Sequence, residues 1–473
     1  MTIDYTHDGV ASTIKASPRE ALKKYSRKEV ALHETPKDCW LVIDGKVYDV
    51  TKWVPKHPGG SLIHVRAGQD STYLFNSYHP LYVWKLLDQY CVGEIDASDE
   101  DLSMTNVEYL DTVKEPFYLA LKERVEGYFH RNKVNPRVHS HLFIKSAVIL
   151  ALYLFFYYLM FFQVQNPIIS SIYAIAFGYI SAHIAMNIMH DGNHGAYSTW
   201  PWFSYLMGIS SDLIGASSYI WRQQHIIAHH AYTNVNKFDP DIRANDVDIR
   251  RVHLEQPRHS FHAYQHIYLW PLYGLMTLKA IWFDDFQALI TGKIGQGIIA
   301  KMTPLEILVF WGSKLSYVVY IVILPFLYSN YEISTMVKLY ILSQLVCGWT
   351  LAILFEISHV VESATFLTVD LNKGVPTVPY GWAAMQVCAS TNYNTGSTLW
   401  LHLSGGLIYQ IEHHLFPGVC HMHYPSIQPI VEATCKEFNI PYKRHASFFA
   451  GVKGHFTHLK QVGLKDMDLR LAG

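Results

Sequence analysis

The sequence predicts a multi-domain chain in which a small α+β domain is followed by an all-α integral membrane domain. Residues 1–140 are polar and rich in charge, whereas the apolar residues are concentrated after residue 143. Half of the 473 residues are hydrophobic and 16% are charged, whereas a soluble domain is roughly 25% charged. The apolar part contains four long runs. We therefore expect about four transmembrane helices in two hairpins, with a helical cap on the cytosolic side that holds a metal site.

Composition narrows the chemistry that this chain can support. The formal net charge of −1 gives no indication of a nucleic-acid partner. The six cysteines include no C-x-x-C pair, which argues against a disulfide framework and against a cysteine zinc site. The chain has 27 histidines. Imidazole is therefore the expected ligand for any metal.

The small domain is expected over residues 21–95. It lies between a polar tail over 1–20 and a linker and pre-membrane segment over 96–140. The run WLVIDGKVYDV has two short β-type stretches around Asp44 and Gly45, which is a hairpin signal. The residues after this hairpin have a helical pattern, so the domain is expected to mix short strands with helices.

Two histidines of this domain are each followed by proline. His57 begins the run His-Pro-Gly-Gly, in which proline fixes one φ angle and the glycines allow the backbone to approach a bulky group. His79 offers a second imidazole in the run Tyr-His-Pro. Taken alone, His-Pro-Gly-Gly is more often an ordinary turn. His64 lies seven residues after His57 and is the competing ligand.

Four apolar runs in the second part are each close to the ~20 residues that cross a bilayer. Short polar breaks join them into two helical hairpins. Residues 201–220 and 266–290 are partly apolar but carry Pro, Asp, His and Gly, so we expect them to be interfacial or re-entrant. The four expected membrane helices cover residues 142–162, 168–189, about 305–328 and about 336–358.

The parity of the hairpins places the polar segments on one side of the membrane. The first twenty residues have no basic segment followed by an apolar core, so they are not a secretory signal and the N-terminal region is expected in the cytosol. Two hairpins then return residues 190–300 and everything after 359 to the cytosol. Five cations between Lys122 and Arg137 precede the first crossing, in agreement with the positive-inside rule.

Three histidine clusters fall on this cytosolic side. Residues three or four apart lie on one face of a helix, about one turn apart, so each cluster can direct its imidazoles to a common point. A single such pair is more often a packing feature, but three clusters on one side indicate a site for iron, zinc or copper. The clusters are His190 with His194, His225 with His229 and His230, and Gln410 with His413 and His414.

Other metal chemistries fit the sequence less well. A metalloprotease helix would read H-E-x-x-H, and neither four-apart histidine pair has that glutamate. A ferritin-type carboxylate site needs two E-x-x-H motifs, and this chain has one, from Glu356 to His359. A histidine-dominated cluster with enough ligands for two metals remains.

The run from KDCWLVIDGKVYDV through HPGG to YHP resembles the cytochrome b5 haem domain along nearly its full length. The resemblance implies that His57 and His79 are the two axial ligands of haem b. Bis-histidine ligation leaves no open position on the iron, so such a haem carries electrons. Fusion of this domain would raise the local concentration of the electron donor, and residues 96–140 would give it reach.

The three histidine clusters, the membrane hairpins and the fused haem domain together resemble a membrane fatty acid desaturase, and the run YQIEHHLFP resembles the front-end group. The resemblance covers residues 21–445, with a desaturase domain over 141–445 and a C-terminal tail over 446–473. Gln410 departs from the histidine of other desaturases, and an amide oxygen is a weaker ligand. The resemblance implies two iron ions held by His190, His194, His225, His229, His230, His413 and His414, with His359 as a further ligand and Gln410 beside them.

This resemblance implies an O2-dependent enzyme of the endoplasmic reticulum that inserts a cis double bond between the carboxyl end and an existing double bond of an acyl chain. Delta-5 desaturation of 20-carbon polyunsaturates is the preferred outcome, carried on CoA or on phospholipid. Electrons would come from NADH through a separate cytochrome b5 reductase. The alternatives are a delta-4, delta-6 or delta-8 desaturase, a sphingolipid desaturase, a hydroxylase, or a membrane-anchored electron carrier without iron chemistry.

Residues near the second cluster are candidates for substrate contact. Trp221 and Arg222 precede the cluster directly, so we expect them to meet the polar head of the substrate at the cytosolic face, with the acyl chain in an apolar tunnel. Six other histidines of the desaturase domain are expected to be structural: His183, His262, His266, His402, His421 and His423.

Overall fold

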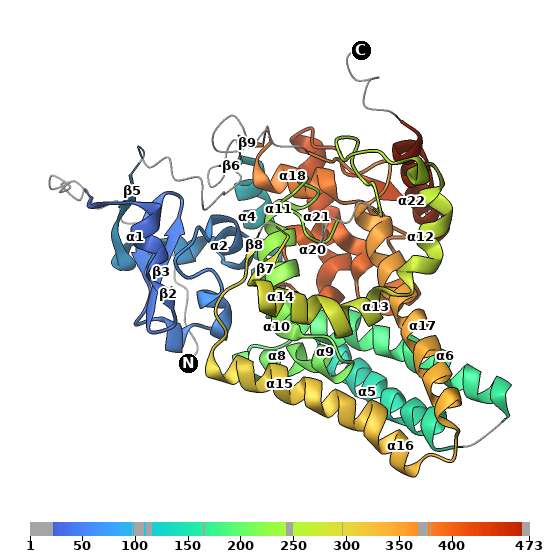
Figure 1. The fold of residues 1–473 in the computed structure, drawn as a ribbon. Helices are drawn as coiled ribbons and strands as arrows, with labels where there is room; N and C mark the ends of the chain where they lie inside the picture. The colour runs from blue at the N-terminus through green and yellow to red at the C-terminus, as the bar shows by residue number, and fades with distance from the viewer. Residues whose placement is uncertain are drawn as a thin grey trace.

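The structure is a computed structural model that describes residues 22–96, 98, 108–109, 116–163, 166–242, 249–295, 297–367, 377–378 and 380–465. The expected tail over 1–20 lies outside the described residues, and the segment 96–140 is described in part. Figure 1 shows the small domain beside the cap. The long helices gather at one end of the molecule.

The small domain is built on a five-stranded sheet. Strands β3 and β4 form the expected hairpin, with Asp44 at φ 52° and Gly45 at φ 71° in its turn, the left-handed conformation that two-residue hairpin turns require. The short edge strand β1 pairs in parallel with β5. The sheet order is β1 (Lys24–Tyr25), β5 (Cys91–Ile95), β4 (Lys46–Asp49), β3 (Asp38–Ile43) and β2 (Glu34–Thr35).

Helices of the small domain cover this sheet and position its two histidines. Helix α2 (Thr72–Tyr78) ends at His79, whose backbone N–H donates to the carbonyl of Phe75. The core between sheet and helices contains buried Ile43 and Phe75. The other described α-helices of the domain are α1 (Arg27–Ala31) and α3 (Trp84–Leu87).

Four helices are long and apolar enough to cross a bilayer among the residues that the structure describes. Their number and order confirm the four expected spans. The second helix joins α6 (Pro167–Ile184) to α7 (His190–Asn193), and the third joins α15 (Pro304–Val318) to α16 (Leu324–Tyr328). The four spans are α5 (Ser140–Phe161), Pro167–Asn193, Pro304–Tyr328 and α17 (Ile333–His359).

The two inner spans, α6 and α17, carry the first cluster and His359 toward the cap. They pack closely against each other, because a Cβ atom at Gly178 would overlap the carbonyl oxygen of Ser343. The outer spans expose apolar side chains such as Phe155 and Leu308, as lipid-facing helices do. Small residues such as Gly178 permit the close contact between α6 and α17.

Replacing Gly178 by alanine should destabilise the protein. The added methyl group meets the α17 backbone, which cannot move aside cheaply, and overpacking of this kind costs about 1–3 kcal/mol. The matched control is Gly312→Ala on α15, where a Cβ meets nothing within 4 Å and helix propensity favours alanine. Thermal unfolding in detergent should show a lower midpoint for G178A alone, and an unchanged midpoint for G178A would contradict this packing.

The cap is made of short helices and three two-stranded pairs. The segments 201–220 and 266–290, which we expected to be interfacial or re-entrant, form helices too short to span a bilayer. The cap helices not yet named are α8 (Pro201–Gly208), α9 (Ser210–Leu213), α10 (Ser218–Trp221), α11 (His230–Tyr232), α12 (Gln265–Tyr273), α13 (Met276–Lys279), α14 (Asp285–Thr291), α18 (Trp382–Ala389), α19 (Thr398–Leu403), α20 (Gln410–Leu415) and α21 (Tyr424–Glu437). The strand pairs are β6 (Glu108–Tyr109) with β9 (Thr377–Val378), β7 (Lys293–Ile294) with β8 (Gly297–Ile298), and β10 (Asn392–Tyr393) with β11 (Arg444–His445).

The expected tail over 446–473 is wrong for residues 448–464, which form helix α22 (Phe448–Leu464). Helix α22 packs against α12 and α17. The fully buried Arg251 donates to the carbonyl oxygen of Val462 over 2.8 Å, and Nδ1 of His455 lies 2.6 Å from the carbonyl oxygen of Val360. The last helix is therefore part of the cap.

The segment 96–140, which we expected to give the small domain reach, includes helix α4 (Pro116–Asn132), which holds that domain against the cap. Buried Lys122 donates to the carbonyl oxygens of Asn76 and His79 over 2.8 and 2.5 Å. Tyr118 donates to the carbonyl oxygen of Asn76 over 3.0 Å, with that of Leu415 at 3.3 Å. One helix thus contacts both the α2 end and the third histidine cluster.

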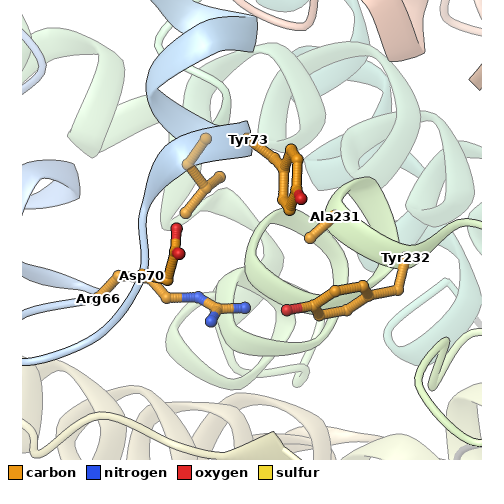
Figure 2. A pocket seen from close by; sticks show the side chains of 6 residues that line it. Arg66, Asp70, Tyr73, Ala231 and Tyr232 are labelled. Atoms are coloured by element: carbon orange, nitrogen blue, oxygen red, sulfur yellow. The ribbon is translucent and has the colours of Figure 1, made fainter. Parts of the chain in front are cut away.

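A second contact region, called the seam below, joins the small domain to the helix of the second cluster through Arg66, Ile227 and Tyr232. Arg66 donates to the carbonyl oxygen of Ile227 over 3.0 Å. Its guanidinium also lies 6.0 Å from the ring centre of Tyr232, at the edge of cation–π range. Figure 2 shows Arg66 and Tyr232 facing each other across this seam. The small domain is therefore held against the cap by Arg66 as well as by α4.

Candidate functional site

The first two histidine clusters lie on or beside π-helical turns. One covers Ala185–Met189, directly before His190, and the other covers Arg222–His229. The sequence predicts ordinary α-helical spacing of these histidines, whereas the structure has a wider π-helical turn. It brings Nε2 of His225 to 3.3 Å from Nε2 of His230, five residues later. Isolated π turns inside helices occur frequently at functional sites.

Four imidazoles form the first candidate metal position. His190, His194, His225 and His413 each offer a ring nitrogen within 4.8 Å of the others. All four are buried. They come from three separate helical segments, so the fold brings together what the sequence places more than 200 residues apart.

Three more imidazoles form a second candidate position. His229, His359 and His414 offer nitrogens within 4.8 Å of one another, and Nε2 of His359 lies 3.2 Å from Nε2 of His414. His230 stacks on His414 at 4.4 Å between ring centres and lies 4.8 Å from the ring of His194. His230 therefore lies between the two positions.

Gln410 faces the second position. Its amide nitrogen lies 2.8 Å from Nε2 of His359 and 3.2 Å from Nε2 of His414, while its amide oxygen is buried without a partner. A half-turn of the amide exchanges these two atoms. Gln410 can therefore present its oxygen to a cation held by the two imidazoles.

Most of these imidazoles are held through Nδ1, which leaves Nε2 directed into the cluster. Nε2 of His190, His194, His229 and His413 is buried with no hydrogen-bond partner among the described atoms. This pattern fits metal binding, because a ligating histidine binds through one nitrogen and donates its other N–H to a neighbouring acceptor. The atoms that face Nδ1 are Tyr78 Oη for His194 (2.5 Å), Asp241 Oδ2 for His225 (2.9 Å), Asp239 Oδ1 for His229 (3.0 Å), Ala389 O for His359 (3.3 Å), Tyr424 Oη for His413 (3.2 Å) and Gln386 Oε1 for His414 (2.8 Å).

The protonation of the cluster also suits metal ions. Burial lowers the pKa of His225 to about 4 and lowers the pKa values of His194 and His413 well below their usual range. These rings are neutral at pH 7 and keep a lone pair for a cation. At His229 burial also lowers the pKa, but the carboxylates of Asp239 and Asp241 outweigh burial and raise it.

Sequence reasoning missed the two aspartates. Asp239 and Asp241 stand ten and twelve residues after His229 in the run KFDPDIR, and an acid pair close after a histidine cluster is a signal that could have found them. Carboxylates that accept from ligating histidines orient the rings and raise their basicity. Asp239 is fully buried, as is His229.

Replacing Asp239 by asparagine should weaken metal binding. The amide keeps the volume but removes the negative charge, and loss of such a partner typically costs about 10–100-fold in metal affinity or activity. Iron content per purified chain, measured by elemental analysis after dialysis against a chelator, checks this. Exposed Asp44→Asn is the control, and equal iron retention in D239N and wild type would contradict the role of Asp239.

The contacts of Trp221 and Arg222 within the protein differ from each other. Arg222 is buried, and it pairs with Asn193 at 3.2 Å and with Glu306 at 3.4 Å. It therefore ties two membrane spans together. Trp221 stacks on His225 at 4.4 Å between ring centres, so it lies against the cluster.

The histidines expected to be structural lie outside the two candidate positions. Nδ1 of His421 lies 2.8 Å from Asp191, the residue after His190. Nδ1 of His183 lies 3.0 Å from the side chain of Asn187, and Nε2 of His423 lies 3.1 Å from a backbone carbonyl oxygen. His262 is a fully buried residue beside α12, and His266 packs edge-on against Phe456.

The small domain carries a separate pair of facing imidazoles. Nε2 of His57 lies 3.4 Å from Nε2 of His79, and Nδ1 of His79 lies 3.0 Å from the carbonyl oxygen of Phe75. Burial lowers the pKa of His57 to about 4 and that of His79 to about 3, so both rings are neutral. A Cβ at Gly59 would lie 2.7 Å from the His57 ring, which explains the glycine. The pair fits two axial ligands of a haem.

The competing ligand His64 lies elsewhere. It is buried, and besides burial its pKa is influenced by the charges of Glu306 and Arg222 in the membrane domain. His64 therefore belongs to the seam between the domains.

Comparison with known proteins agrees with this arrangement. Residues 26–96 match the family described as cytochrome b5-like haem/steroid binding domain, and residues 168–446 match the family described as fatty acid desaturase. This chain belongs to the fatty acid desaturase family. It is a front-end desaturase, an oxidoreductase with a fused cytochrome b5-like domain.

Relatives of this desaturase align along nearly their whole length. "Acyl-lipid (8-3)-desaturase" of Physcomitrium patens is 53% identical and covers 95% of this chain and 93% of its own. "Delta(5) fatty acid desaturase A" of Dictyostelium discoideum is 36% identical over 93% and 94%. "Acyl-lipid (8-3)-desaturase" of Mortierella alpina is 32% identical over 94% and 98%.

Membership of the family defines the broad chemistry of the desaturase. The cytochrome b5-like domain implies haem, the desaturase domain implies iron, and the substrates are fatty acyl lipids. Together with the four apolar spans, it indicates an integral membrane protein.

Proposed function

We propose that this desaturase inserts a cis double bond at the delta-5 position of a 20-carbon polyunsaturated chain carried on a lipid. The observation that carries the proposal is the buried cluster of imidazoles whose Nε2 atoms lack partners. The names of the relatives support the finer points. Some read Delta(5), and several read acyl-lipid.

The proposed ligand set follows the two groups of nitrogens. His190, His194, His225 and His413 would hold one iron ion. His229, His359 and His414 would hold the other, with Gln410 as a weak ligand and His230 as a further imidazole beside them. His57 and His79 hold the haem. When bound, the two irons supply the O2 activation that removal of hydrogen from an unactivated methylene group requires.

The reaction must balance in electrons as well as atoms. Two adjacent CH2 groups lose two hydrogens and become a CH=CH unit, and O2 is reduced to two molecules of water. The substrate supplies two of the four electrons that O2 accepts. The other two, with two protons, come from outside the substrate. We propose NADH as their source, passed through a separate cytochrome b5 reductase to the haem domain.

Residues of this chain orient the site and keep water out. Asp239 and Asp241 hold His229 and His225 by their Nδ1 atoms, and Gln386 holds His414. Trp221 covers one side of the first position. The rings are thus fixed before substrate arrives, as efficient catalysis requires.

Fatty-acid profiling tests the function. A host without 20-carbon desaturation expresses the full chain and is fed defined 18- and 20-carbon polyunsaturated acids, with His414→Ala as the inactive control. A new double bond between the carboxyl end and an existing one, absent from the control, supports the proposal. Delta-8 is the second candidate, because the names of several relatives carry the label (8-3), and the position of the new bond separates the two.

Other products would overturn parts of the proposal. A delta-4 or delta-6 product would correct the regiochemistry, and a desaturated sphingoid base would correct the substrate. A hydroxylated chain would make the enzyme a hydroxylase. No new lipid, with haem present and iron absent, would leave a membrane-bound electron carrier.

We also propose that the protein lies in the endoplasmic reticulum with both ends and the histidine cluster in the cytosol. The even number of apolar spans supports this topology. Glycosylation acceptor sites placed in the turn near Gln163 should be modified in cells. Acceptor sites near Lys443 should stay unmodified, and the reverse pattern would overturn the orientation.

A further inference from the structure

The residue before the proposed haem ligand contacts a proposed iron ligand. Tyr78 is the last residue of α2, and its hydroxyl oxygen lies 2.5 Å from Nδ1 of His194. The two rings are nearly parallel, with 19° between their planes. Nε2 of His194 faces the first iron position without a partner, so the metal-binding tautomer carries its proton on Nδ1. The Nδ1–H group then donates to the phenol oxygen.

The surroundings of Tyr78 are built for this contact. A Cβ at Gly418, in the loop after the third cluster, would lie 3.3 Å from the Tyr78 ring, so a larger residue there would crowd it. This close packing holds the Tyr78 ring where its hydroxyl reaches His194.

Hydrogen bonds to the neighbouring backbone also fix the position of Tyr78. Lys122 donates to the carbonyl oxygen of His79, the next residue, and to that of Asn76, two residues before. The third cluster shares this support, because Tyr118 approaches the carbonyl oxygens of both Asn76 and Leu415. The α2 end is thus held against the first and third clusters, which both contribute to the first iron position.

We propose that Tyr78 is a positioning residue for electron delivery, which links His79 of the haem site to His194 of the iron site through one peptide linkage and one hydrogen bond. The inference rests on the proposed function. In each transfer one electron leaves the haem, which goes from ferrous to ferric, and one ferric ion of the cluster becomes ferrous. No bond of Tyr78 forms or breaks.

The physical reason is continuity of the path. Electron transfer slows steeply when the path includes a gap through space, and a bonded path of two residues avoids such a gap. Removing the hydroxyl of Tyr78 opens a break between its ring and Nδ1 of His194. The alternative is that Tyr78 only orients His194, as other Nδ1 partners orient theirs, and the experiment must separate these two roles.

The test compares Tyr78→Phe with wild type in the full-length protein, purified in detergent with haem and iron. Tyr82→Phe is the matched control, because Tyr82 belongs to the same domain and is 57% exposed. The haem is reduced by NADH and cytochrome b5 reductase and then mixed rapidly with O2 and a 20-carbon acyl substrate. We expect haem reoxidation to be slower in Y78F, because the bonded path is broken, and unchanged in Y82F.

A chemical bypass separates electron delivery from support of the iron. Dithionite with methyl viologen reduces both metal sites directly, and a single exposure to O2 then permits one turnover. We expect Y78F to form as much product per iron pair in this single turnover as wild type, with the same iron content and haem spectrum. A bypass yield that falls together with the reoxidation rate, or a loss of iron, would overturn the inference in favour of a purely structural role.

Two further outcomes are decisive. Reoxidation at the wild-type rate in Y78F, with product still formed, would overturn the inference and leave the proposed function intact. A wild-type protein that forms no product even after chemical reduction would overturn the proposed function and the inference with it.

Discussion

Replacing His229 by alanine should reduce desaturation by more than about 100-fold, since loss of an indirect partner alone reaches that figure. His229 is fully buried within the cluster. Its ring centre lies 4.8 Å from that of His359 and 4.9 Å from that of His414. The second iron position would lose one of three imidazoles, and alanine cannot replace it. Product per cell and iron per purified chain should therefore fall together.

The control for this experiment is His402→Ala, a histidine of the same domain outside both candidate positions. It should keep its iron and most of its activity. If H229A retained full activity, the assignment of the cluster to iron would be wrong. If H229A lost activity but kept both irons, the cluster would still hold metal, and His229 would act on the substrate instead.

Removing His79 should abolish the haem spectrum and the activity that depends on NADH. Nε2 of His79 faces Nε2 of His57, and a bis-histidine haem that loses one ligand is held by a single bond to protein. Because the iron cluster belongs to other helices, iron content should stay near the wild-type value. The visible absorption spectrum and iron analysis of H79A measure the two sites independently.

His64→Ala distinguishes the two candidate haem pairs. His64 lies near Glu306 and Arg222 rather than opposite His57, so H64A should keep an unchanged haem spectrum. A lost spectrum in H64A, with H79A unaffected, would reverse the assignment of the haem ligands.

Much of the fold could be predicted from local sequence signals. The hairpin turn at Asp44 and Gly45 needs two left-handed residues in a row, and the sequence Asp-Gly is typical of that need. The four spans follow from length and hydropathy alone. Helix α22 was missed because it is amphipathic, and its contacts with Arg251 and Val360 show that it belongs to the cap.

The candidate metal-binding histidines could be predicted because they are clustered in the sequence. The residues that hold their rings could not be predicted, because only the fold brings them close. The histidine clusters are dense in sequence, and the structure brings them together as expected. The groups that hold their rings are single residues far away, such as Gln386 for His414 and Tyr424 for His413. Nothing local marks such residues. The π turn at Arg222–His229 was equally hidden, because side-chain patterns predict α and β periods but not an inserted residue.

The docking of the small domain affects how the two external electrons reach the iron site. Each double bond takes two electrons from outside the substrate, and one haem carries one electron at a time. The haem must therefore be reduced a second time before the reaction is complete. A domain that undocked for each refill would add a second departure and return to every double bond. With Lys122 and Arg66 holding it in place, the reductase that we propose would instead have to approach the side of the small domain that α4 and the cap leave open. Under the proposed function the small domain would stay docked through both transfers, and the reductase would come to it twice for each double bond.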